Sequence, residues 1–255
     1  MSKESNTKRN PLNERQEGGL ICVIRVDRAE LTRNEIIRVA ANRFLNDGYT
    51  KTTVASMAKA LNMSTGNITF HFPTKEHMLA ELVSILCRYQ HKLMEEEAKE
   101  GYSSVIAVCL ELLTIASACE HDEVAKDFFL SSYRSEICME LIRRSDKERA
   151  REVFREYCPH WTEEQFTEAA ALVSGIEYAT LLTTGESASL ELRVEGALRA
   201  ILTIYNVPKE LQDEKIKKVL SMDYRTLGMD TLRRFREFVD QATEQALLDL
   251  LKRKH

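Results

Sequence analysis

The chain has 255 residues, of which 44% are hydrophobic and 30% are charged, and its formal net charge at pH 7 is −4. This composition is typical of a folded protein and excludes a wholly disordered or collagen-like chain. The charge is divided unevenly, because residues 1–75 carry a net +5 and the remaining residues carry −9. A basic N-terminal third on an acidic body indicates a small anion-binding module joined to a second unit.

Residues 1–30 are predicted to form a basic, disordered extension. Residues 1–17 are polar, and such a composition does not support a packed core. Residues 20–26 are a short apolar run of strand-like composition without a visible partner strand, and their role stays open. A helical pattern then begins at Thr32, which we expect to cap the first helix. One face of that helix carries Ile36, Ile37, Ala40, Ala41 and Phe44, at spacings of three and four.

Two short helices are predicted next, over residues 54–61 and 65–70. Thr53 and Ser64 are the expected N-caps, since hydroxyl side chains accept the free backbone N–H groups of a first turn. Asn62 lies between the two helices and tolerates the left-handed backbone that a tight turn requires.

The rest of the chain is also predicted to be helical. Nine glycines and four prolines are few for this length, which favours helices with short connections. A long helix is expected from Thr74 to Lys99. Further helices are expected over residues 103–119, 123–142, 147–157, 162–183, 190–205, 209–220 and 230–254, with one break at Gly228. The sequence therefore predicts an all-α fold.

The six cysteines, Cys22, Cys87, Cys109, Cys119, Cys138 and Cys158, are scattered without a CxxC pair. The polar N-terminus lacks the apolar core of a secretory signal. We therefore expect reduced, mostly buried thiols in a cytoplasmic protein that holds no metal. The longest weakly charged stretch, residues 102–119, is too short and too polar for a bilayer span, so no membrane contact is expected.

Two short helices joined by a tight turn inside a basic segment are typical of a helix-turn-helix, whose second helix enters the major groove of DNA. Residues 33–82 also resemble the DNA-binding domain of the tetracycline-repressor (TetR) family. The resemblance runs through Gly48-Tyr49, Thr52-Thr53-Val54 and Leu61-Asn62-Met63-Ser64, and its most specific block is Phe70-His71-Phe72-Pro73-Thr74-Lys75-Glu76. It implies a three-helix DNA-binding domain at residues 31–78. It also implies a larger helical domain at residues 79–255 that dimerises and holds a small-molecule pocket, without enzymatic activity or an obligatory cofactor.

The resemblance assigns DNA contacts by position. Thr53 and Lys75 match phosphate contacts, and His71 matches a backbone or base contact. Thr69 departs from the family, which often has Tyr there, so the role of Thr69 is in doubt. Together with the cap residue Ser64 and the exposed start of the recognition helix, the predicted DNA-binding set is Thr53, Ser64, Thr65, Gly66, Asn67, Thr69, His71 and Lys75.

The recognition helix is unusually neutral, because no Lys or Arg lies between Asn62 and Thr74. It therefore lacks the arginine that pairs with guanine through two hydrogen bonds. We expect Asn67 to read adenine and the Thr65 methyl group to touch a thymine methyl group, which favours an A/T-rich half-site. Six basic residues of the extension, Lys3, Lys8, Arg9, Arg15, Arg25 and Arg28, form either a solvated tail or an arm along the minor groove.

The helices expected at 162–183 and 190–205 resemble, in order and position, the pair that forms the family's dimer interface. The predicted dimer residues are Ala169, Val173, Ile176, Val194, Ala197, Leu198 and Ile201, although an internal core uses the same pattern. Pocket residues are expected to combine apolar walls with polar groups. The predicted set is Cys109, Leu113, Phe128, Phe129, Tyr133, Tyr178 and Thr180, and each of these also fits a plain core.

The function predicted in this way is that of a homodimeric regulator that binds a palindromic DNA operator. The family's usual behaviour favours a repressor that a small-molecule effector releases. An activator, or an interaction protein that no longer reads DNA, stays open as an alternative. An enzyme is disfavoured, because the six histidines are isolated and no GxGxxG, P-loop or GxSxG sequence is present.

Overall fold

The computed structural model describes residues 12–99 and 104–252, with side chains at residues 28–99 and 104–246. In those ranges every regular element is a helix, which confirms the predicted all-α class. The helices are α1 (Leu12–Asn46), α2 (Val54–Ala60), α3 (Thr65–His71), α4 (Lys75–Ala98), α5 (Val105–His121), α6 (Glu123–Arg134), α7 (Glu136–Val153), α8 (Glu163–Leu181), α9 (Leu190–Ile204), α10 (Lys209–Leu220) and α11 (Tyr224–Lys252).

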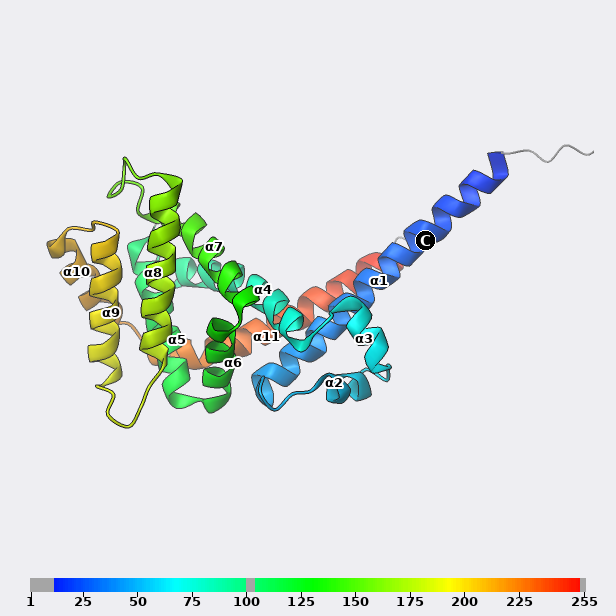
Figure 1. The fold of residues 1–255 in the computed structure, drawn as a ribbon, viewed down its shortest axis with the longest axis horizontal. Helices are drawn as coiled ribbons and strands as arrows, with labels where there is room; N and C mark the ends of the chain where they lie inside the picture. The colour runs from blue at the N-terminus through cyan, green and yellow to red at the C-terminus, as the bar shows by residue number, and fades with distance from the viewer. Residues whose placement is uncertain (1–11, 100–103, 253–255) are drawn as a thin grey trace, which may run out of the picture.

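The helices are arranged with the helix-turn-helix and the α8–α10 group at opposite ends of the molecule. Figure 1 shows α1, α2 and α3 at one end, α8, α9 and α10 at the other, and α4 passing between them. The core of the N-terminal unit is formed where α1, α2, α3 and α4 meet. Its fully buried side chains include Ile36, Phe44, Met57, Ile68 and Met78, so the predicted apolar face of α1 does line this core.

The first helix is longer than predicted. It begins at Leu12, so residues 12–30, expected to be disordered with a strand-like run at 20–26, are helical instead. Thr32 is not its cap: the Thr32 hydroxyl donates to the Arg28 carbonyl 2.9 Å away, a bond to the residue four positions earlier that is typical of a helix interior. The predictions for residues 1–11 lie outside the described residues.

The connection between α6 and α7 also differs from the prediction. We expected one helix over residues 123–142, a break, and a second helix over 147–157, but the chain breaks at Ser135. The Ser135 backbone N–H ends α6 by donating to the Ser131 and Ser132 carbonyls. Its side chain begins α7 by accepting from the Cys138 N–H group at 3.3 Å. The helical spacing of apolar residues continues through Ser135, so this spacing alone did not predict a break there.

Gly228 was predicted to lie in a break before the last helix but lies inside α11, which packs along α5 and α1 (Figure 1). The glycine is needed for a close approach between helices. A Cβ atom at Gly228 would lie 2.6 Å from the Thr114 carbonyl oxygen of α5. The long C-terminal helix therefore joins the two parts of the molecule, and Asn42 of α1 donates to Asp240 of α11 at 3.2 Å.

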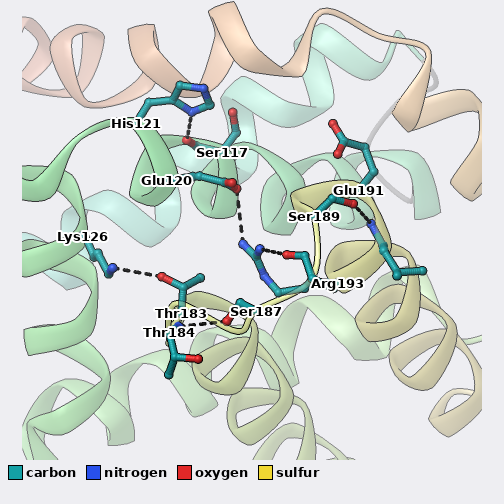
Figure 2. A network of polar contacts seen from close by, with 12 residues as sticks. Ser117, Glu120, His121, Lys126, Thr183, Thr184, Ser187, Ser189, Glu191 and Arg193 are labelled. Carbon is teal, nitrogen blue, oxygen red and sulfur yellow. Dashed lines mark hydrogen bonds and ion pairs between the residues drawn. The ribbon is translucent and has the colours of Figure 1, made fainter.

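The loop between α8 and α9 is fixed against α5 and α6 by the polar contacts shown in Figure 2. Lys126 of α6 donates to the Thr183 hydroxyl at 3.0 Å. Arg193 of α9 donates to Glu120 at 3.3 Å and to the Ala188 carbonyl at 2.5 Å. These contacts hold the α8–α9 pair in a fixed position relative to the centre of the protein.

Candidate functional site

The connection between α2 and α3 has the geometry of a helix-turn-helix. Thr53 caps α2, because its hydroxyl accepts from the Ser56 N–H group at 3.1 Å while the Ser56 hydroxyl accepts from the Thr53 N–H group. Asn62 adopts the left-handed conformation, with φ of 52°. Ser64 then caps α3 by accepting from the Asn67 N–H group at 3.1 Å. The predictions for both caps and for the turn residue are confirmed.

Helix α3 presents a polar face to solvent. Ile68 is fully buried and fixes the rotation of the helix, as predicted. Thr65, Gly66, Asn67 and Thr69 are therefore exposed. The structure thus places the predicted recognition residues together on one open face. Among them, the Thr69 hydroxyl donates to the Gly66 carbonyl at 3.2 Å, within its own helix.

Phe70 is a feature that sequence reasoning missed. Its side chain is 81% exposed on the outer face of α3, directly after Thr69. Its ring meets the His71 ring edge to face, with centroids 5.2 Å apart. The signal was present in the sequence, because Phe70 lies two positions, about 200° of helix rotation, after the inward-facing Ile68 and therefore points away from the core.

His71 lies beside a cationic side chain from α1. Arg33 donates to the His71 carbonyl at 3.1 Å and to the Glu81 carboxylate at 2.5 Å, and its guanidinium lies 4.1 Å from the centre of the Phe72 ring. Partial burial and the Arg33 charge lower the pKa of His71 below its ordinary value. The imidazole is therefore neutral at pH 7, so any contact it makes with DNA is a hydrogen bond without an added charge.

Lys75 begins α4 and points back to the loop before α2. Its ammonium group donates to the Tyr49 carbonyl at 2.8 Å and to the Thr52 carbonyl at 2.9 Å, and lies 4.1 Å from the centre of the Tyr49 ring. Burial lowers the pKa of Lys75. An ammonium group has three N–H bonds, so these two contacts leave one N–H for a further acceptor. Lys75 thus stabilises the domain in addition to the phosphate contact predicted for it.

The neighbouring Glu76 ties the helix-turn-helix to the rest of the chain. It accepts a hydrogen bond of 2.5 Å from the hydroxyl of Ser135, the residue that separates α6 from α7. The first turn of α4 therefore contacts two units at once: Lys75 holds the loop before α2, and Glu76 holds the α6–α7 junction.

A cavity of about 80 Å³ lies in the larger domain. Side chains from α4, α5, α6, α7, α8 and α9 form its wall. The lining residues are Val83, Leu86, Cys87, Gln90, Val108, Glu111, Leu112, Ile115, Phe129, Ser132, Tyr133, Ile142, Asp146, Arg149, Ala150, Phe154, Val173, Glu177, Ile201 and Tyr205.

The cavity contains charged groups that sequence reasoning missed. Glu111 pairs with Arg149, and Glu177 accepts a hydrogen bond of 3.0 Å from the Tyr133 hydroxyl. Burial, together with the charge of Glu111, raises the pKa of Asp146 to about 7. Burial and the nearby Asp146 also raise the pKa of Glu177 well above its ordinary value. The spacing of these residues is the same as that of charged residues on ordinary surface helices, so the sequence did not identify them as cavity residues.

The predicted pocket residues are only partly brought together. Phe129 and Tyr133 line the cavity. Cys109, Leu113 and Phe128 are fully buried among other core side chains and are not part of its wall. The remaining two residues make contacts elsewhere: the Tyr178 hydroxyl accepts from Arg134 at 3.2 Å, and the Thr180 hydroxyl donates to the Ile176 carbonyl at 2.7 Å.

The predicted dimer residues face inward. Ala169, Val173, Val194, Ala197, Leu198 and Ile201 are buried within the single chain, and Ile176 is partly buried. Six of these seven side chains are therefore covered by the chain itself, and the position of the dimer surface stays a prediction. An amphipathic pattern reports which face is apolar, but it does not report whether the same chain or another one covers that face.

The outward faces of α8 and α9 carry a different set of residues. Two exposed stripes of small and apolar side chains run along the helices: Leu172, Gly175, Ala179 and Leu182 on α8, and Leu192, Gly196 and Ala200 on α9. Leu172 is 52% exposed and Leu192 is 63% exposed. No atom lies within 4 Å of a Cβ built at Gly175 or Gly196. We call these two stripes the α8–α9 outer face.

Three further features of the structure concern metal sites, membrane-spanning helices and paired cysteines. Across residues 12–99 and 104–252, no group of three or more His, Cys, Asp or Glu side chains is placed to hold a metal ion. In the same ranges, no helix combines the length and apolar character needed to cross a bilayer. The five cysteines with described side chains are free, and all except Cys87 are buried.

Comparison with solved structures finds similar chains at low sequence identity. The chain is similar to TylP, a TetR regulator from Streptomyces fradiae, with 20% identity, 82% of this chain and 93% of that chain covered, and a TM-score of 0.48. It is also similar to an ArpA-like gamma-butyrolactone receptor, with 20% identity, 76% and 96% of the two chains covered, and a TM-score of 0.42.

The sequence comparisons concentrate on the helix-turn-helix. The family model for bacterial regulatory proteins of the tetR family matches residues 36–82. A curated relative, the HTH-type transcriptional regulator QacR of Staphylococcus aureus, is 32% identical over 68 residues, which are 26% of this chain and 36% of QacR. The match thus spans about a third of that relative. Residues 36–82 are therefore similar to the tetR family of bacterial regulatory proteins.

Proposed function

We propose that the protein is a homodimeric transcriptional regulator whose binding to operator DNA is controlled by a small molecule in the central cavity. In this proposal α3 of each protomer enters the major groove, and the two copies of α3 lie about 34–36 Å apart on a palindromic site. Thr65, Asn67 and Phe70 face the bases and sugars. Thr53, His71 and Lys75 hold the backbone.

The observation that carries the proposal is the position of α4. Its first turn contacts the helix-turn-helix through Lys75 and the α6–α7 junction through Glu76. Two to four turns further on, the same helix supplies Val83, Leu86, Cys87 and Gln90 to the cavity wall. A molecule that fills the cavity therefore presses on the helix that positions the DNA-binding unit.

The two binding events are thermodynamically linked in this mechanism. A ligand that favours a dimer with altered spacing of the two α3 helices weakens DNA binding, and DNA weakens ligand binding by the same factor. Coupling energies of this kind are typically about 1–3 kcal/mol. Release of a bound repressor is the outcome we propose.

The proposed dimer surface is the α8–α9 outer face. Its exposed leucines are apolar side chains that a second copy covers. The glycines allow two helix pairs to approach closely, because no side chain separates them. The surface lies at the end of the molecule opposite α3 (Figure 1), so a pair formed there leaves both recognition helices free.

Fluorescence-anisotropy binding to the DNA that flanks the gene, repeated across a salt series, tests the DNA-binding function. We expect tight binding with a steep negative dependence of log K on log salt, since phosphate contacts release counterions. If neither this DNA nor sequences selected from a random pool are bound by a confirmed dimer, the proposal is wrong. The exposed Phe70 then indicates that α3 docks on a protein partner instead. A reporter gene placed behind the bound DNA distinguishes repression from activation.

The Leu192→Glu variant tests the dimer surface, because it places a charge in the proposed contact. We expect a monomer in light scattering and a large loss of DNA affinity. Met229→Glu is the matched control, because Met229 is also an exposed apolar residue, at 59%, but lies on α11. It should remain a dimer and bind DNA normally. A dimeric Leu192→Glu protein with intact DNA binding would remove this face from the proposal.

A further inference from the structure

We propose that the central cavity binds an organic monocation, a protonated amine attached to an apolar body, with Glu177 and Asp146 as its counter-charges. The inference names the ligand class of the cavity. It rests on the proposed function in one respect, namely that this cavity is the effector site. It is carried by the charges, the unpaired polar atoms and the aromatic walls of the cavity.

The charges of the cavity wall do not balance. Three carboxyl groups line it, those of Glu111, Asp146 and Glu177, together with one guanidinium, that of Arg149. Glu111 and Arg149 pair with each other. His91 lies 3.7 Å from the other side of Glu111, and burial lowers its pKa, so it adds no positive charge at pH 7. Asp146 and Glu177 are left without a cation of their own in the wall.

Polar atoms of the wall also lack hydrogen-bond partners. Among the described residues, none bonds the Gln90 side-chain N–H₂ group, the Oδ2 atom of Asp146, or the Nε and Nη2 atoms of Arg149. Gln90 is only 2% exposed, and all three residues line the cavity. A buried polar group without a partner is destabilising. Gln90 and Arg149 therefore call for hydrogen-bond acceptors from the ligand, and Asp146 calls for a donor such as an ammonium group.

The electrostatic state of the empty cavity agrees with this assignment. Burial is the main cause of the raised pKa of both Asp146 and Glu177; the charge of Glu111 adds to it at Asp146, and the charge of Asp146 adds to it at Glu177. A cation placed beside the two carboxyl groups offsets these effects and allows both to ionise. A ligand carboxylate would instead add a negative charge beside them, so the two groups favour a cation over an anion.

Aromatic rings complete the environment of a cation. Phe154 and Tyr205 stack with centroids 4.2 Å apart and line the cavity together with Tyr133. Ring faces attract cations, most strongly when water is excluded. Val83, Leu86 and Ile142 form apolar wall for the rest of the ligand. The combination suits an amine with a hydrophobic body more than a small, strongly hydrated ion.

Isothermal titration calorimetry on the full-length protein at neutral pH tests the proposal with three probes of one shape. The probes are 2-phenylethylamine, 2-phenylethanol and 3-phenylpropanoate, whose head groups are cationic, neutral and anionic. We expect the amine to bind at least about tenfold more tightly than either of the others. Equal or tighter binding of the alcohol or the acid overturns the proposal, and so does the absence of amine binding.

Two variants locate the counter-charge. Glu177→Gln and Asp146→Asn keep the shape of each side chain and remove its charge, so each should reduce the preference for the amine over the alcohol severalfold. Glu168→Gln is the matched control, because Glu168 is an exposed carboxylate on the same helix as Glu177. It should leave the preference unchanged. An unaltered preference in both cavity variants, with folding verified by circular dichroism, contradicts the assignment.

The anisotropy assay on the same sample separates the two proposals. DNA binding without amine binding refutes the cation site and leaves the DNA-binding function in place. Amine binding without DNA binding refutes the proposed function and leaves the cation site in place.

Discussion

Thr50 and Asp127 form a two-point hydrogen bond between the helix-turn-helix and the larger domain. The Thr50 N–H group donates to one carboxylate oxygen of Asp127 at 2.8 Å, and the Thr50 hydroxyl donates to the other. Gly48, with φ of 96°, turns the chain so closely past this carboxylate that a Cβ atom there would lie 3.0 Å from it. Asp127 belongs to α6, which also lines the cavity with Phe129. Asp127 therefore links a helix that lines the cavity to the loop before α2.

Loss of this contact should weaken the attachment of the helix-turn-helix. We expect Asp127→Ala to lower the free energy of unfolding by about 1 kcal/mol, because two hydrogen bonds at a partly exposed site are lost. Chemical denaturation measures the change. Glu123→Ala, which removes an exposed side chain of the same helix, serves as the comparison. Equal stability of the two variants would show that the Thr50–Asp127 contact contributes nothing.

Asn67 is expected to read one base. Asn67→Ala should cost on the order of 1–3 kcal/mol of DNA-binding free energy and relax the preference at one position of the half-site. Anisotropy against a set of single-base operator variants measures both effects. The folded state should be unaffected because Asn67 is exposed. An unchanged base preference would remove Asn67 from direct readout.

Lys75 holds the loop before α2 and is also predicted to contact phosphate, and one variant tests both roles. Lys75→Ala should weaken binding to all DNA sequences and flatten the salt dependence by about one unit of slope. It should also lower thermal stability, because the Tyr49 and Thr52 carbonyls lose their donor. Lys92→Ala removes an exposed lysine of the same helix and should change neither property. A loss of stability with an unaltered salt slope would assign Lys75 a purely structural role.

Gly228 should not tolerate a side chain. Gly228→Ala places a methyl group against the Thr114 carbonyl, so α11 must move away from α5, at a cost of about 1–3 kcal/mol. Gly66→Ala provides the comparison within a helix, because its Cβ would meet only the Ser64 hydroxyl at 3.9 Å. Denaturation should show a stability loss for Gly228→Ala alone. Similar stabilities would mean that the α5–α11 contact adapts without cost.

Stability should fall as the pH rises through the acidic range. The pKa of Asp146 is raised from 3.8 to about 7 in the folded protein, so the folded state holds a proton that the unfolded state releases. The resulting stabilisation is complete below pH 4 and is lost as the pH rises towards 7. Asp146→Asn should flatten this dependence in denaturation curves at pH 4–7, and Glu168→Gln should not. An unchanged slope in Asp146→Asn would contradict the raised pKa.

The sequence predicted local structure well where that structure depends only on residues close together in the chain. The caps Thr53 and Ser64, the turn at Asn62 and the limits of α10 are confirmed. These features depend on a few neighbouring residues and on backbone chemistry that each residue type carries with it. The expected break at Gly228 was wrong, because the role of that glycine depends on α5, more than a hundred residues earlier.

The cavity was harder to predict for the same reason. Asp146 and Glu177 are ordinary helix-surface residues by their spacing, and only the packing of α7 against α8 turns them inward. Periodicity distinguishes apolar from polar faces, but it does not identify which polar residues a neighbouring helix encloses. The outward face of α8 and α9 depends on packing in the same way, since only the folded chain shows that Leu172 and Leu192 stay exposed.

The packing of α11 along α1 has a consequence for synthesis of the chain. Asn42 bonds to Asp240, and Asn46 accepts a hydrogen bond from Arg236. The first helix of the DNA-binding unit therefore gains these partners only after nearly the whole chain has left the ribosome. A chain whose synthesis stops early presents a recognition helix on an incompletely supported unit. The contacts between α1 and α11 therefore form last, although α1 itself is translated first.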